Sequence, residues 1–135
     1  LLALRALPAL PLAPALARPT IAHIATLGPD GAPQSTPVWF RYDGETVKFS
    51  LTTGRQKYRN VTRNPAVALS ILDPDNPYRY LEVRGVVSSI DADPDLAFIN
   101  SLAQRYLGEE KYPWHQPSDQ RVIVSITPQH STAMG

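Results

Sequence analysis

The sequence contains no cysteine. Disulfide bonds, thiolate metal sites and cysteine nucleophiles are therefore excluded, and a reducing compartment such as the cytoplasm is the expected location. Three histidines are present, His23, His115 and His130, and they lie far apart without the spacing of metal ligands. We therefore expect no metal site.

A large excess of charge of either sign is also missing. The formal net charge is +1, whereas a general nucleic-acid binder usually carries a large positive excess. No apolar run reaches the roughly 18 residues of a membrane span. We therefore expect neither nucleic acid nor a membrane as a partner. Glycine-rich phosphate loops, dinucleotide fingerprints and nucleophile elbows are absent as well.

The residues that are present divide the chain into two parts. The first part, residues 1–19, contains only Leu, Ala, Pro and Arg. Prolines at positions 8, 11 and 14 would remove helix hydrogen bonds, so a long regular helix is excluded there. A secretory signal is one interpretation, but a basic start is missing and proline breaks the apolar run. An apolar segment that packs on the barrel or on a neighbouring subunit is the better supported interpretation.

Residues 20–135 form the second part, and their pattern predicts one β-rich domain. Asp43-Gly44 is the strongest hairpin signal. A short helix is expected at 53–64, stopped before Pro65, and a longer one from Asp93-Pro94 to about Leu107. Strands connected mostly by hairpins predict an antiparallel barrel with helical additions. The six expected strands are 20–27, 34–42, 45–52, 66–72, 78–90, with a bend near Gly85, and 121–128.

A basic cluster follows the predicted strand 45–52. A helix N-terminus offers unpaired N–H groups and a partial positive charge, which suits a phosphate. Cations in the first helical turn oppose the helix dipole, and a phosphate bound between Arg55 and Lys57 would resolve that conflict. The alternative is a solvated basic face. The cluster consists of Arg55, Lys57, Arg59 and Arg63, and the turn before it is Thr52-Thr53-Gly54.

Three further segments are candidates for a site. Residues 34–39, with Pro37 inside, suit the edge of a flat ring, although an ordinary edge strand is the better supported interpretation. Residues 76–80 place two tyrosines around an arginine, which suits a ring or a carboxylate, and equally a subunit contact. Residues 112–115 are either part of a substrate wall or, with better support, a loop anchored by its aromatic side chains.

Several motifs in fixed order resemble the pyridoxamine-phosphate-oxidase-like split-barrel superfamily, and within it the flavin/deazaflavin oxidoreductases. The resemblance spans roughly residues 20–128. It implies a six-stranded antiparallel split β-barrel, mainly β with α additions, that forms a homodimer with a cofactor in each of two clefts at the subunit boundary. The motifs are ATL-x-x-DG-x-P at 25–33, PVWF at 37–40, TTGRQKYRNV at 52–61, NP-x-V at 64–67 and EVRG at 82–85.

The resemblance also implies a cofactor and its contacts. The expected cofactor is coenzyme F-420 (8-hydroxy-5-deazaflavin), which the lysine of GRQK favours, and FMN is the alternative. Hydride would pass between the cofactor and a small unsaturated or quinone-like substrate. A non-catalytic deazaflavin carrier is a second alternative. The resemblance identifies no catalytic residue, and Tyr78, Tyr80 or water would supply a proton.

The implied cofactor contacts come from four stretches of the chain. Arg55, Gln56 and Lys57 would meet the phosphate or its neighbouring atoms. Two stretches border the ring system, and a fourth approaches from the other subunit. The ring contacts are Ser50 and Leu51 on one strand and Gln34, Ser35, Thr36, Pro37 and Val38 on another, and the contacts from the other subunit are Asn76, Pro77, Tyr78 and Arg79.

Overall fold

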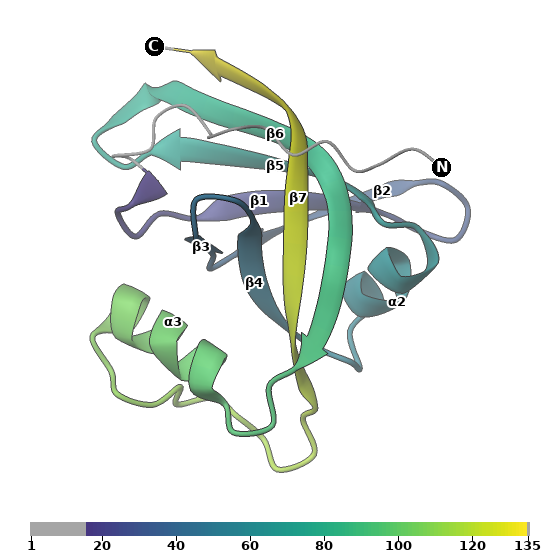
Figure 1. The fold of residues 1–135 in the computed structure, drawn as a ribbon, viewed down its shortest axis with the longest axis vertical. Coiled ribbons are helices and arrows are strands. Elements are labelled where there is room, and N and C mark those ends of the chain that lie inside the picture. Colours follow the sequence, from purple (N-terminus) through teal and green to yellow (C-terminus); the bar gives the residue numbers. More distant parts are fainter. Residues whose placement is uncertain (1–15, 135) are drawn as a thin grey trace.

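The structure is a computed structural model that describes residues 16–134 (Figure 1). It contains one antiparallel sheet of seven strands in the order β2-β1-β5-β6-β7-β4-β3. The helices α2 (Gln56–Arg63) and α3 (Ala97–Leu107) follow β4 and β6. The strands are β1 (Ala22–Leu27), β2 (Pro33–Val38), β3 (Arg41–Tyr42), β4 (Val47–Thr52), β5 (Ala66–Asp73), β6 (Asn76–Ala92) and β7 (Arg121–Met134).

The sheet curls because its two outermost strands are neighbours in the sequence. β2 and β3 stand at opposite ends of the strand order, yet Trp39 and Phe40 alone separate them along the chain. Such a short link requires the two edges of the sheet to approach each other. No hydrogen-bonded pairing between β2 and β3 is seen in the described residues, so the barrel stays open at this seam.

The expected number of six strands was wrong, because the predicted strand 34–42 is two strands. The chain leaves the sheet at Phe40, whose side chain is completely buried. The backbone N–H of Phe40 donates to the Tyr106 hydroxyl at 3.0 Å, and this hydroxyl donates to the Thr20 carbonyl at 2.7 Å. A side chain on α3 therefore replaces the strand partner that Phe40 lacks.

Burial alternates along β4, as expected of a half-buried antiparallel strand. In β4, Val47, Phe49 and Leu51 are buried, whereas the residues between them are partly exposed. The bend expected near Gly85 is confirmed, because the β6–β7 register shifts between Arg84 and Gly85. The largest fully buried apolar side chains come from five strands, the seam and α3: Phe40, Phe49, Ile24, Leu69, Leu81, Leu102, Ile126, Val47, Val83 and Val124.

Several element ends differ from the sequence-based expectation. β6 starts at Asn76 rather than at 78, so the interval between the expected strands 66–72 and 78–90 shortens to a turn. β7 continues to Met134, beyond the expected end at 128, because its second half pairs with the start of β6. The second helix begins at Ala97 rather than at Asp93-Pro94. The Asp93 carboxylate instead accepts from the backbone N–H groups of Phe98 and Ile99 in its first turn, at 3.2 and 3.1 Å.

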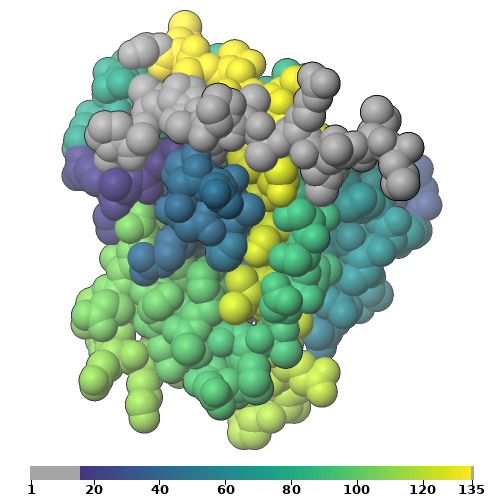
Figure 2. Space-filling model, in the orientation of Figure 1, coloured from purple at the N-terminus to yellow at the C-terminus, as the bar shows by residue number. Residues whose placement is uncertain are grey.

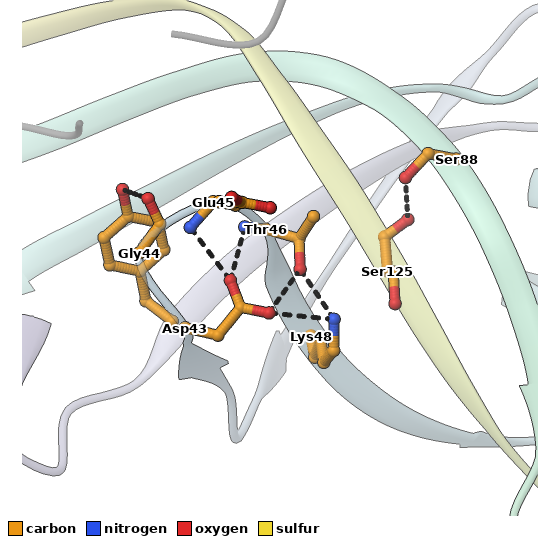
Figure 3. Close-up of polar contacts among 8 residues, drawn as sticks. Asp43, Gly44, Glu45, Thr46, Lys48, Ser88 and Ser125 are labelled. Carbon is orange, nitrogen blue, oxygen red and sulfur yellow. Dashed lines mark hydrogen bonds and ion pairs between the residues drawn. The ribbon is translucent and has the colours of Figure 1, made fainter. Parts of the chain in front are cut away.

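The expected turn at Asp43-Gly44 is confirmed between β3 and β4 (Figure 3). The Asp43 carboxylate accepts from the backbone N–H groups of Glu45 and Thr46 at 2.9 and 2.7 Å. It also accepts from the Thr46 hydroxyl and forms an ion pair with Lys48 at 3.1 Å. Gly44 has φ +96°, a conformation that glycine adopts at low cost. The turn is therefore organised by one carboxylate.

The N-terminal segment is described only at its end, since residues 1–15 lie outside the described residues. Leu16 is buried in the core. The Arg105 guanidinium donates to the backbone carbonyls of Leu16, Ala17 and Arg18 at 2.9–3.0 Å. α3 thus holds the end of this segment against the barrel. The predictions for residues 1–15 stay untested.

Candidate cofactor-binding site

A cavity of about 370 Å³ opens between β4, the start of α2, the Trp39 seam, α3 and the loop that precedes β7. Its volume lies at the lower end of the usual range for small-molecule sites. Figure 2 shows α3 and the loop after it, in green, forming the lower part of one face of the molecule. The cavity is lined by Ile21, Pro37, Val38, Trp39, Ser50, Leu51, Thr52, Arg55, Lys57, Ile99, Leu102, Tyr112, Trp114 and Arg121.

The turn between β4 and α2 brings two cations to the cavity. Backbone bonds fix this turn: Arg55 N–H donates to the Thr52 carbonyl at 3.2 Å, and Thr53 N–H donates to the Gln120 carbonyl at 3.0 Å. Arg55 is the N-cap of α2, and its side chain makes no capping hydrogen bond. The first turn of the helix contains no acidic residue. The positive end of α2 therefore faces the cavity together with Arg55 and Lys57.

Lys57 sits in an electrostatically unfavourable place. Burial lowers the pKa of the Lys57 ammonium, and the nearby Arg55 charge lowers it further. The Phe49 ring, with its centroid 6.0 Å from Nζ, gives only weak compensation. A bound anion would offset both effects, since it favours the charged form of lysine.

A third cation, Arg121, begins β7 opposite Thr52. One guanidinium nitrogen of Arg121 donates to Ser50 Oγ at 3.3 Å, and its Cζ lies 4.5 Å from the centroid of the Tyr112 ring. Its Nε is buried without a hydrogen-bond partner in the structure. Within residues 16–134, no ion pair includes Arg55, Lys57 or Arg121. The cavity thus holds three cations and no paired carboxylate.

Aromatic rings form another side of the cavity. The Trp39 ring stacks on Tyr106, with centroids 5.1 Å apart and an angle of 8° between the planes. Tyr112 meets Trp39 edge-on at 6.0 Å, and Trp114 meets Tyr112 edge-on at 5.6 Å. Trp114 is 57% exposed at the edge of the cavity. Flat apolar walls beside cations suit a planar ligand that carries negative charge.

Six of the residues expected to bind the cofactor line this cavity. They come from β2, β4 and the start of α2, three segments that are separate in sequence and that the fold brings together. They are Pro37, Val38, Ser50, Leu51, Arg55 and Lys57.

The other expected residues lie elsewhere. Gln34 and Gln56 bind the buried Asn60: Gln34 Oε1 accepts from Asn60 Nδ2 at 3.1 Å, and Gln56 Nε2 donates to Asn60 Oδ1 at 2.8 Å. Ser35 and Thr36 belong to β2 but do not line the cavity.

The stretch expected from the other subunit, residues 76–79, starts β6. There Arg79 forms an ion pair with Asp73 at 3.3 Å, and Asn76 Oδ1 accepts from the backbone N–H of Tyr78 at 3.1 Å. The Tyr78 side chain is 83% exposed. None of these four residues lines the cavity of the single chain. Their contact with a cofactor across a subunit boundary stays a prediction.

Sequence reasoning missed several residues of the cavity. Tyr112 and Trp114 were considered as a substrate wall, but the anchored loop was the preferred interpretation. The loop is anchored by the Tyr112 N–H, which donates to Asn100 Oδ1 at 2.8 Å, and by the contacts of the Tyr112 ring with Trp39 and Trp114. Both Tyr112 and Trp114 line the cavity, and their contact with a substrate stays a prediction. Arg121 was not singled out. No local motif marks it, since its place depends on the pairing of β7 with β4.

The fold is that of a known protein family. The family model described as pyridoxamine 5'-phosphate oxidase matches residues 12–135. The chain therefore belongs to the pyridoxamine 5'-phosphate oxidase family. No curated protein matches the chain.

Solved structures agree with this assignment. An F-420 reductase is 49% identical, with a TM-score of 0.80, over 88% of this chain and 94% of that one. A conserved hypothetical protein from Mycobacterium tuberculosis is 24% identical, with a TM-score of 0.68, over 98% and 89% of the two chains. General stress protein 26 from Bacillus anthracis is 19% identical, with a TM-score of 0.67, over 91% and 90%. The last two show the fold alone.

Residues 16–134 contain neither a membrane-spanning helix nor a cluster of metal ligands. No helix there has the length and apolar character needed to cross a membrane. No group of three or more histidine, aspartate or glutamate side chains in that range is arranged to hold a metal ion.

Proposed function

We propose that this protein is an oxidoreductase that transfers hydride between the deazaflavin coenzyme F-420 and a small unsaturated or quinone-like substrate. The observation that carries the proposal is the pair Arg55 and Lys57, which face one cavity from the uncapped start of α2 without a carboxylate partner in the described chain. The 49% identity to an F-420 reductase supports the deazaflavin over FMN.

The residues of the cavity fit such a cofactor. Lys57 and the start of α2 would hold its phosphate, because a phosphate offsets the burial of the ammonium and the nearby Arg55 charge. Pro37, Val38 and Leu51 would border the ring system, since they form apolar parts of the same cavity wall. Gln34 and Gln56 are less direct candidates because their amides bind Asn60.

The protein's own contribution is binding, orientation and exclusion of water. When bound, the deazaflavin supplies or accepts the hydride, so the chain needs no acid–base pair for that step. The cavity residues with hydroxyl groups able to hold or move a proton at the substrate are Ser50, Thr52 and Tyr112. Tyr78 and Tyr80 lie outside the cavity lining. We further propose a homodimer in which residues 76–79 of the partner subunit complete the site.

Calorimetric titration of the full chain with oxidised coenzyme F-420 and, separately, with FMN tests the proposal. Saturable binding of the deazaflavin is expected, and Lys57→Met should weaken it by about tenfold or more, since a charged hydrogen bond is lost. Arg84→Met is the matched control. Arg84 is exposed on β6, forms an ion pair with Glu82 and does not line the cavity, so affinity should stay unchanged.

Each other outcome has a definite meaning. Failure of both cofactors to bind the wild-type chain would reject the proposed function. Preference for FMN would move the chemistry to the flavin alternative at the same site. Tight deazaflavin binding without oxidation of the reduced coenzyme by any enone or quinone tested would support the carrier alternative.

A further inference from the structure

The cations of the cavity fall into two groups with different surroundings. Arg55 and Lys57 belong to the start of α2, whereas Arg121 belongs to β7. The Cα of Arg121 is paired with that of Thr52, but its guanidinium reaches back to Ser50, two residues earlier on β4. Two strand residues correspond to about 6–7 Å. The Arg121 side chain therefore points along β4 away from the turn that leads into α2.

Arg121 is held in a fixed orientation by its neighbours. Its Cζ lies 4.5 Å from the Tyr112 ring centroid, and Ser50 Oγ accepts one of its N–H groups. Tyr112 is fixed in turn, because its backbone N–H donates to Asn100 on α3. A guanidinium oriented by stacking presents its remaining N–H groups as a planar fork, which matches the two oxygens of a carboxylate.

The Arg121 guanidinium also has unused capacity to donate. Its Nε is buried without a hydrogen-bond partner, and no carboxylate of residues 16–134 pairs with it. A buried donor without a partner carries a cost, which a ligand acceptor would remove. Arg105 also has a buried Nε without a partner, but it binds three backbone carbonyls. The Arg121 guanidinium instead donates to a single hydroxyl, that of Ser50.

An aromatic surface lies next to this guanidinium. Tyr112 and Trp114 both line the cavity, with ring centroids 5.6 Å apart, and Trp114 is more than half exposed. Exposure of a large aromatic side chain at a cavity edge leaves an open ring face for stacking. A rigid planar ligand loses little entropy when it binds such a surface.

We propose that Arg121, Tyr112 and Trp114 form a substrate subsite for planar conjugated carboxylates. The carboxylate would bind the Arg121 fork, and the conjugated system would stack on Trp114. This inference rests on the proposed function, because it leaves Arg55 and Lys57 to the cofactor phosphate. It narrows the substrate from any unsaturated molecule to one that combines a flat conjugated system with a carboxylate.

Calorimetry on the cofactor-free full chain tests the subsite with three probes: naphthoate, its neutral amide and cyclohexanecarboxylate. Naphthoate should bind saturably. The neutral amide should bind about tenfold or more weakly, because it cannot form the charged fork, and the non-planar carboxylate should be similarly weakened. Arg121→Met should reduce naphthoate affinity by about tenfold or more. Trp114→Ala should reduce it by about fivefold or more through lost stacking.

Further variants separate a loss of naphthoate recognition from misfolding, and separate the proposed subsite from the cofactor site. Arg121→Lys keeps the charge but loses the fork and the stacking, so it should still weaken naphthoate severalfold. Arg84→Met is the matched control, since Arg84 is exposed on β6 and its ion pair is with Glu82. Thermal unfolding of each variant confirms that it is folded. Lys57→Met should leave naphthoate affinity within about threefold, because only the longer-range charge is removed.

The results separate this inference from the proposed function. Equal affinity for naphthoate and its amide, or no saturable naphthoate binding, would overturn the subsite. Loss of naphthoate binding in Lys57→Met, with displacement by inorganic phosphate, would also overturn it, because the anion would then sit at α2. If the chain binds neither cofactor, the proposed function fails. Naphthoate binding that still depends on Arg121 would then support the subsite on its own.

Discussion

Two polar clusters include residues of α2 or its N-cap, and their hydrogen bonds differ. In the first, the completely buried Asn60 donates to Thr26 Oγ1 and Gln34 Oε1 and accepts from Gln56 and Arg63. The second consists of the cavity cations Arg55, Lys57 and Arg121, which have no carboxylate partner in the part of the chain that the structure describes. The first cluster is saturated by the chain itself, whereas the second is not.

This difference is the one expected between polar groups with a structural role and polar groups that bind a ligand. Buried polar groups are normally hydrogen-bonded, so a saturated cluster needs no ligand to account for it. A group of like charges without counter-charges is unfavourable in the folded protein alone. Polarity and position beside α2 are common to both clusters. Saturation by the chain is the property that separates them.

The largest expected effect comes from breaking the saturated cluster. Asn60→Ala should lower the free energy of unfolding by about 3 kcal/mol, because Thr26 and the surrounding amides lose partners inside the protein. Urea unfolding measures the change. Thr62→Ala is the matched control on the same helix, since the Thr62 hydroxyl is exposed and bonds only locally to the Arg59 carbonyl. It should change stability by less than about 0.5 kcal/mol.

A small change in the free energy of unfolding for Asn60→Ala would contradict the proposed difference between the two clusters. A loss below about 1 kcal/mol would mean that water replaces the amide in the cluster. The saturation seen in the folded chain would then not indicate a structural role.

The difference between the clusters was only partly predictable from the sequence. Period-two alternation identified β4, and the basic turn identified Arg55 and Lys57, because both signals are local. Asn60 carries no local signal of burial. A polar residue on a short basic helix suggests solvent, and contact with Thr26 on β1 buries it.

Long-range packing also explains the other misses. The break at Phe40 depends on the Tyr106 hydroxyl, 66 residues away in the chain. Arg121 reaches the cavity because β7 pairs with β4 in a register that places it opposite Thr52. Neither contact leaves a pattern in the neighbouring residues. Local periodicity therefore recovered most elements, whereas the seam and half of the cavity depend on the tertiary fold.

Asp43 is a charged group whose hydrogen-bond partners come from the chain itself, and substituting it should change stability by an intermediate amount. Burial raises the pKa of Asp43, but hydrogen bonds from the backbone of Thr46 and Glu45, and from the Lys48 and Thr46 side chains, outweigh it and hold the pKa well below its usual value (Figure 3). Asp43→Asn should lower stability by about 1 kcal/mol at neutral pH, because charge-assisted bonds are lost.

The pH dependence of this effect has a definite sign. A carboxylate whose pKa is lowered on folding stabilises the folded state at pH values above its pKa in the unfolded chain. That contribution is lost as the pH falls toward its pKa in the folded state. The difference between wild type and Asp43→Asn should therefore shrink as pH falls below 3.8, the usual aspartate value. Chemical unfolding at a series of acidic pH values measures it. A difference that grows on acidification would contradict the role of the carboxylate. Glu45→Gln, at an exposed position of the same turn, is the control.

The smallest expected effect on stability comes from the unsaturated cluster. Lys57→Met should change the free energy of unfolding by less than about 1 kcal/mol at neutral pH, because the partly exposed charge is screened by solvent. The sign should be neutral or stabilising, since burial and Arg55 both disfavour the ammonium in the folded state. The same substitution should weaken cofactor binding, so stability and function respond in opposite directions.

Alkaline pH tests the sign of that small effect. With its pKa lowered in the folded state, Lys57 loses its proton there before it does in the unfolded chain, so the unfolded state binds more protons. The stability of the wild type relative to Lys57→Met should therefore rise as pH increases toward 10.5, the usual lysine value. Lys111→Met, at an exposed site, is the control. A relative loss of stability on raising the pH would mean that the ammonium is already stabilised within the folded chain. Lys57 would then belong with Asn60 among the saturated groups, and the case for an anion at α2 would fail.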